Sequence, residues 1–147
     1  MKGKMYMEER YKSVVCVDLI IEKDDKKILL MKRKNTGNDD GMYELPGGHL
    51  EKNEDLYDAM IRETKEELDI DINKEDLDLI YLMHHYTGER LNFIFKTKLN
   101  NLKPIIAEPN KCEELKWVKI NSLPSNTTNK VKIIINDIIN NNKYNKL

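Results

Sequence analysis

Runs of apolar residues at two-residue spacing alternate with helical patterns along this chain. Segments rich in β-branched and aromatic side chains predict strands at residues 13–21, 27–33, 77–86 and 90–99, with a short fifth strand around Trp117. Turn formers join the first two segments and the last two, so each pair is expected to form a hairpin. In the last of these four strands every second residue from Leu91 to Leu99 is expected to lie on one side.

Two segments carry helical spacing. Residues 55–68 contain neither Gly nor Pro, and Asn53 is the expected N-cap of this helix. A second amphipathic helix is predicted from the spacing of Val131, Ile134, Ile135, Ile138 and Ile139. Asn126 is expected either to cap the second helix or to read the edge of a base, with capping favoured. Residues 140–147 are expected to be a frayed tail.

Length and charge bound what the chain can be. It has 147 residues, of which 35% are charged, and a formal net charge of −1. One hydrophobic core is therefore expected, and neither a nucleic acid nor a membrane surface is favoured as a partner. No apolar run approaches the length of about 18 residues that a membrane span needs, and the first residues lack a signal segment. Two cysteines without framework spacing suit a reducing compartment, so a cytoplasmic protein is expected.

The first helix carries an unusual cluster of like charges. Glu63, Glu66 and Glu67 are spaced i, i+3, i+4 and therefore share one face. Such pairs repel by roughly 0.2–0.5 kcal/mol each. A cation bound against the cluster explains it better than a merely solvated surface does.

Carboxylate oxygens suit hard divalent ions, so Mg²⁺, with Mn²⁺ as a substitute, is the expected cofactor. Zinc is disfavoured, because the two cysteines and three histidines show no structural-zinc spacing. Gly47 and Gly48 precede the helix and allow the backbone to approach an ion or a phosphate closely. His84 and His85 are expected to be ordinary strand-end residues, since phosphoryl chemistry with bound metal needs no imidazole.

These residues resemble the signature of a known family. Gly48, Glu54, Arg62-Glu63, Glu66-Glu67 and an aliphatic Ile70 stand at the spacing found in Nudix hydrolases. At about 6% per residue type, a chance match of the six fixed positions in a chain of this length is on the order of one in 10⁵. Two positions depart from the pattern, since Thr64 stands where an aliphatic residue is usual and Asp69 where a glycine is usual.

The resemblance implies an α/β fold, the Nudix α/β/α sandwich with a mixed β-sheet between helices. It implies a single domain over residues 1–147, with a core at about 11–139. The implied metal ligands are Gly47 (through its carbonyl), Glu63, Glu66, Glu67 and Glu108, the last on a loop that resembles one in MutT-type members. Glu67 and Glu108 lead as general base, with Glu66 and Arg62 completing the catalytic group. Arg62 is expected to pair with Glu54 or Glu66, and Gly48, Glu54 and Ile70 are structural.

The family acts on nucleoside diphosphates linked to another group, so a small nucleotide is the implied substrate. The expected contacts are Arg33, Glu44, Tyr86, Arg90 and Asn126. A nucleoside triphosphate, ordinary or oxidised, is favoured, giving a monophosphate and pyrophosphate. A dinucleoside polyphosphate is the alternative, because Tyr86 follows Ile70 by sixteen residues. The proline typical of many ADP-ribose hydrolases is absent. A non-catalytic nucleotide sensor is less favoured, and the chain is expected to be a monomer or a homodimer.

Overall fold

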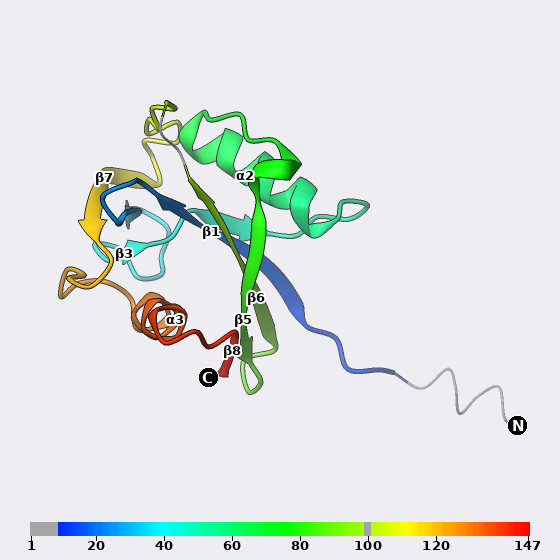
Figure 1. Ribbon diagram of the computed structural model, residues 1–147. Helices are drawn as coiled ribbons and strands as arrows, with labels where there is room; N and C mark the ends of the chain where they lie inside the picture. The colour runs from blue at the N-terminus through cyan, green and yellow to red at the C-terminus, as the bar shows by residue number, and fades with distance from the viewer. Residues whose placement is uncertain (1–8, 99–100) are drawn as a thin grey trace, which may run out of the picture.

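In the computed structural model, which describes residues 9–98 and 101–147, a mixed β-sheet lies between two helices (Figure 1). The elements, labelled as in Figure 1, are β1 (Val14–Glu22), β2 (Lys27–Arg33), β3 (Tyr43–Glu44), β4 (Gly47–His49), α2 (Leu56–Leu68), the 3₁₀ turn η1 (Lys74–Asp76), β5 (Asp78–His85), β6 (Arg90–Lys98), β7 (Cys112–Lys119), α3 (Asn129–Ile139) and β8 (Tyr144–Lys146). The predicted α/β/α sandwich is confirmed.

Each face of the sheet carries its own apolar core. On one face Val17, Leu19 and Phe95 pack with Met60 and other residues of α2. On the other face a second group packs under α3, built from Ile20, Ile94, Tyr81, Val131 and Ile134. Because both faces of β6 are covered, Asn92 and Ile94 are buried, as Phe95 on the other side of the strand is. Leu99 lies outside the described residues.

The sheet combines parallel and antiparallel pairs in the order β3-β2-β1-β6-β5-β8, with β4 on β1 and β7 on β2. The predicted hairpin of β5 and β6 is confirmed. The one predicted for β1 and β2 holds only next to its turn, where Glu22 faces Ile28. Beyond that pair the strands part, because β1 continues against β4 and β6 while β2 continues against β3 and β7.

The N-cap of helix α2 lies two residues later than the sequence predicts. The N-cap is Asp55, whose side chain accepts from the Asp58 N–H at 2.8 Å while Asp58 accepts from the Asp55 N–H at 3.3 Å. The prediction of Asn53 as the cap is wrong, because Asn53 has φ of 67° and lies in the preceding turn. The buried hydroxyl of Thr64 is satisfied, since it donates to the Met60 carbonyl at 2.7 Å.

The prediction that residues 140–147 form a frayed tail is wrong. Residues Tyr144–Lys146 form β8, which pairs in parallel with β5. The buried Asp137 of α3 holds this segment, because its carboxylate accepts from the Tyr81 hydroxyl and from the Asn145 amide. Three paired residues and one buried acceptor thus replace the expected tail.

The prediction that Asn126 caps α3 is also wrong. Thr128 occupies the N-cap position, with no side-chain capping hydrogen bond. The Asn126 amide instead donates to the Gly41 carbonyl at 3.0 Å and ties the loop before α3 to the loop before β3. Within residues 9–98 and 101–147, no helix is long and apolar enough to cross a membrane.

Candidate active site

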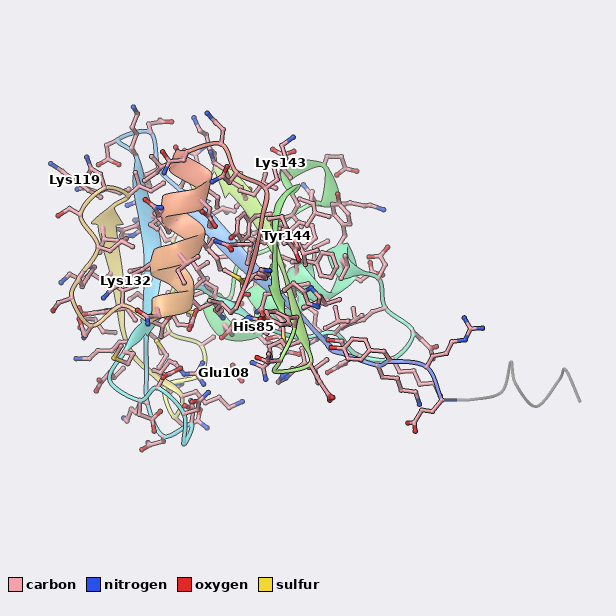
Figure 2. The ribbon with its side chains drawn as sticks, turned by 90° about the horizontal axis from the view of Figure 1, so that it is seen from below. His85, Glu108, Lys119, Lys132, Lys143 and Tyr144 are labelled. Atoms are coloured by element: carbon pink, nitrogen blue, oxygen red, sulfur yellow. The ribbon has the colours of Figure 1, made fainter. Side chains whose placement is uncertain are left out.

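A cavity of about 1100 Å³ opens where β1 and β2 part. Glu108, His85 and Lys132, labelled in Figure 2, are among the residues that line it. Two groups of lining residues carry its chemistry. The carboxylate cluster consists of Gly47, Gly48, Glu63, Glu67 and Glu108, and the lysine cluster consists of Asp18, Glu44, Asn92 and Lys130.

Glu67 is anchored to the glycine turn. The backbone N–H of Gly47 donates to its carboxylate at 2.8 Å. Burial raises the pKa of Glu67 to about 8; the Gly47 N–H opposes this rise, and the nearby charges of Glu63 and Glu108 add to it. The three carboxylates therefore act on one another, although they come from α2 and from the loop before β7.

Gly48 is required by the position of Glu63. A Cβ atom at Gly48 would overlap the Glu63 carboxylate, so no other residue fits there without moving that side chain. Burial raises the pKa of Glu63 as well, against the effect of the neighbouring Arg62. The first glycine of the turn positions Glu67, and the second leaves space for Glu63.

Arg62 connects α2 to the loop that precedes it. It donates to both oxygens of Glu54, at 3.0 and 2.7 Å, and to the His49 carbonyl at 3.0 Å. Its remaining nitrogen donates to Glu63 at 2.9 Å and to Glu66 at 3.3 Å. The pairing predicted with Glu54 and with Glu66 is present. Arg62 lowers the pKa of Glu54, so this fork stays charged on both sides.

The donors of the carboxylate cluster suit a hard divalent cation. The side chains of Glu63, Glu67 and Glu108 and the Gly47 carbonyl offer only oxygen. The pKa values of Glu63 and Glu67 are raised because both carboxylates are partly buried, and a neighbouring cation would favour their ionised form. Glu66 lies beside Arg62, outside the cavity lining. Among the described residues, no three His, Cys, Asp or Glu side chains are already close enough to hold a metal ion.

The lysine cluster was missed by sequence reasoning, apart from Glu44. Lys130, in the first turn of α3, lies 3.2 Å from Glu44 and 3.9 Å from Asp18. Burial tends to lower the pKa of Lys130, but the two carboxylates outweigh burial and raise it. Asn92 donates to Asp18 at 2.7 Å, and Thr128 donates to Glu44 at 3.0 Å. Asp18, an aspartate inside the apolar strand 13–21, is the sequence feature that could have indicated a buried partner cation.

Three of the five predicted substrate contacts line the cavity, namely Arg33, Glu44 and Arg90. The Arg33 side chain is already engaged, since it donates to the Asn38 carbonyl at 2.8 Å. Tyr86 is 53% exposed. Neither Tyr86 nor Asn126 is among the lining residues, so the structure separates these two from the others.

Comparison with known proteins decides the family. Residues 12–136 match the model of the NUDIX domain. The chain belongs to the Nudix hydrolases. Members of this family act on nucleotide derivatives with a divalent metal ion.

Individual relatives differ in what they are named for. An ADP-ribose pyrophosphatase of Methanocaldococcus jannaschii is 55% identical over 53 residues, which are 36% of this chain and 30% of the relative. The match therefore spans less than a third of that protein.

Solved structures extend the likeness to the whole fold. A MutT NUDIX hydrolase of Burkholderia pseudomallei superposes with a TM-score of 0.76 at 27% identity, over 86% of this chain and 98% of that chain. A bifunctional NMN adenylyltransferase/ADP ribose pyrophosphatase of Francisella tularensis, solved with AMP and a manganese ion, gives a TM-score of 0.65 at 21% identity, over 95% of this chain and 44% of that chain.

Proposed function

We propose that this Nudix hydrolase splits a nucleoside triphosphate into a nucleoside monophosphate and pyrophosphate. The observation that carries the proposal is that Glu63, Glu67 and Glu108 line one cavity, with Glu63 and Glu108 near enough to raise the pKa of Glu67. The MutT-like resemblance implies this arrangement, with a glutamate reaching the cluster from a separate loop. Arg33 and Arg90 line the same cavity and supply the positive charge that a triphosphate needs.

Gly47, Glu63, Glu67 and Glu108 would hold Mg²⁺ or Mn²⁺, and Glu66 is a further proposed ligand. A metal ion held there would neutralise phosphate oxygens and acidify a water molecule. A water molecule would form a new P–O bond at one phosphorus of the triphosphate chain while the bridging P–O bond breaks, and the electron pair of that bond would leave with the other product, giving monophosphate and pyrophosphate. Glu67 or Glu108 accepts the proton of the water.

Arg62 and Glu54 hold the site in shape. Their two hydrogen bonds join the helix to the loop that carries the glycine turn, so Glu63 and Glu67 keep a fixed position relative to Gly47. Positioning of this kind supplies much of the catalysis in phosphoryl transfer.

ADP-ribose is the second candidate substrate. The 55% identity to an ADP-ribose pyrophosphatase favours it, although the match covers only 53 residues. The absence of proline between Pro46 and Pro104 argues against it. The position of Tyr86 outside the cavity lining weakens the case for a dinucleoside polyphosphate.

Product analysis separates these substrates. The purified protein is incubated with nucleoside triphosphates, ADP-ribose and a dinucleoside polyphosphate, in Mg²⁺, in Mn²⁺ and in chelator. Monophosphate and pyrophosphate released from triphosphates only in the presence of metal is the expected result. Preferential release of AMP and ribose 5-phosphate from ADP-ribose would overturn the triphosphate proposal in favour of the second candidate.

A further inference from the structure

The lysine cluster adjoins the segment that carries the glycine turn. Glu44 lies three residues before Gly47, and Asp18 faces Gly47 across the pairing of β1 with β4. Lys130 contacts both carboxylates, at 3.2 Å and 3.9 Å, and so bridges the two sides of the segment 44–47. This lysine is therefore placed to fix the glycine turn from helix α3.

Asp18 is packed directly on Gly47. A Cβ atom at Gly47 would overlap the Val17 carbonyl and the Asp18 side chain, so the turn has no free space on this side. Asp18 is itself 4% exposed, and Asn92 holds one of its oxygens at 2.7 Å. Any movement of the Asp18 carboxylate would therefore be transmitted to the Gly47 peptide.

Gly47 in turn holds Glu67. Its N–H donates to the Glu67 carboxylate at 2.8 Å. A continuous series of contacts thus runs from Lys130 through Asp18 to Gly47 and then to Glu67. A parallel route runs from Lys130 to Glu44, whose carboxylate also accepts from the Leu45 N–H at 3.3 Å.

Removal of the lysine charge would leave two buried carboxylates without a cation. Such a pair is repulsive and costly to bury, so the side chains would move apart. This movement displaces the Asp18 carboxylate, which packs directly on Gly47. Thr128 and Asn92 satisfy single oxygens but carry no charge to offset the repulsion.

We propose that Lys130 is a positioning residue for the reaction: it fixes Asp18 and Glu44 and thereby sets the Gly47 peptide that orients Glu67. The proposal rests on the role assigned to Glu67 under the proposed function. It assigns Lys130 no contact with the reacting atoms. Loss of Lys130 should therefore lower kcat and loosen the hydrogen-bonded Gly47 amide.

The test compares Lys130→Met with Lys130→Arg, which keeps the charge. Amide hydrogen exchange of Gly47, measured by NMR on the metal-free protein, is expected to be at least about tenfold faster in Lys130→Met. In the same variant kcat is expected to fall at least about tenfold while KM stays within about threefold of the wild-type value. Lys130→Arg is expected to recover most of both losses.

Lys96→Met is the matched control, because Lys96 also pairs with a glutamate, Glu22, at 2.8 Å and does not line the cavity. It should leave Gly47 exchange and kcat unchanged. If Lys130→Met does not fold, Asp18→Asn, which has the same shape, is expected to give the faster exchange.

Two results would overturn the proposal. One is unchanged Gly47 exchange in folded Lys130→Met, or in Asp18→Asn where the lysine variant does not fold. The other is a raised KM with unchanged kcat, which would make Lys130 a substrate contact. A wild-type protein that hydrolyses no nucleotide would refute the proposed function, whereas the exchange comparison would still decide the role of Lys130.

Discussion

Asp69 ends helix α2 in a conformation that favours glycine. It has φ of 54° and ψ of 40°, and its N–H donates to the Lys65 carbonyl at 3.1 Å. This is the position at which the family pattern has glycine. Asp69→Gly should therefore relieve backbone strain and stabilise the protein.

The magnitude follows from three contributions. Relief of the left-handed conformation gains about 1–2 kcal/mol for an ordinary residue. The greater freedom of glycine in the unfolded chain costs about 0.4–1 kcal/mol. Loss of the exposed Lys65–Asp69 ion pair, 2.8 Å long, adds little to this cost, because solvent screens exposed ion pairs. The net change expected for Asp69→Gly is a gain of about 0.5 kcal/mol.

Asp71→Gly is the matched control. Asp71 also pairs with Lys65, at 3.3 Å, but it is not among the residues with positive φ. Asp71→Gly should raise the conformational freedom of the unfolded chain without relieving any backbone strain. The two variants should therefore differ by about 1–2 kcal/mol in unfolding free energy. In a chain of this size the difference is about 3–6 °C in melting temperature. Equal melting temperatures, or a less stable Asp69→Gly, would refute the assignment of strain to Asp69.

Three further predictions follow from the site and from the C-terminal segment. Gly48→Ala should lower kcat about 100-fold with little change in melting temperature, because the new Cβ would displace the Glu63 carboxylate. Gly88→Ala is the control, because its Cβ would meet nothing closer than 3.6 Å. Equal kcat in the two variants would contradict the prediction. Asp137→Asn should lower stability by about 1–3 kcal/mol at pH 7. Burial alone would raise the pKa of Asp137, but the hydrogen bonds from Tyr81, Asn145 and Asn142 outweigh burial and lower the pKa. The ionised Asp137 carboxylate therefore stabilises the folded protein above the unfolded pKa of about 4, and this stabilisation is lost as the pH falls through the folded pKa. The difference in melting temperature between wild type and Asp137→Asn should therefore shrink from pH 7 to pH 3, and a constant difference would refute this. Deletion of residues 143–147 should lower the melting temperature measurably, because it removes β8 and the Asn145 donor to Asp137, whereas a frayed tail would be lost without effect.

The sequence predicts those parts of the fold whose signals are local. The helix at 55–68 could be read from its spacing, and the pairing of β5 with β6 follows from adjacent strands joined by a tight turn. The choice of Asn53 over Asp55 as N-cap failed because both are good caps. Asp58, three residues after Asp55, was the deciding signal.

Non-local pairing was beyond the reach of the pattern. Nothing in the alternation of residues 13–21 indicates that β1 runs parallel to β6, a strand about 75 residues away along the chain. The strand β8 is three residues long and follows three asparagines, and its order depends on a buried carboxylate on another element. Such contacts exist only once the fold has formed.

The site shows the same division. The glutamates of α2 and their glycine turn could be predicted, because their spacing is a local pattern with a chemical reason. Lys130 could not, since a lysine in the first turn of an amphipathic helix is ordinarily solvated. Its burial depends on Asp18 and Glu44, which lie more than 80 residues away in sequence.

The most direct test of the central claim compares wild type with Glu67→Gln. Initial rates of monophosphate and pyrophosphate release from nucleoside triphosphates are measured in Mg²⁺, with melting temperatures recorded in parallel. Glu113→Gln is the matched control, because Glu113 pairs at 3.5 Å with Lys32, which lines the cavity, but does not line the cavity itself. We expect Glu67→Gln to lower kcat by about 10²–10⁴-fold with the fold intact, and Glu113→Gln to leave it unchanged. Near-normal turnover by a folded Glu67→Gln protein would contradict the account.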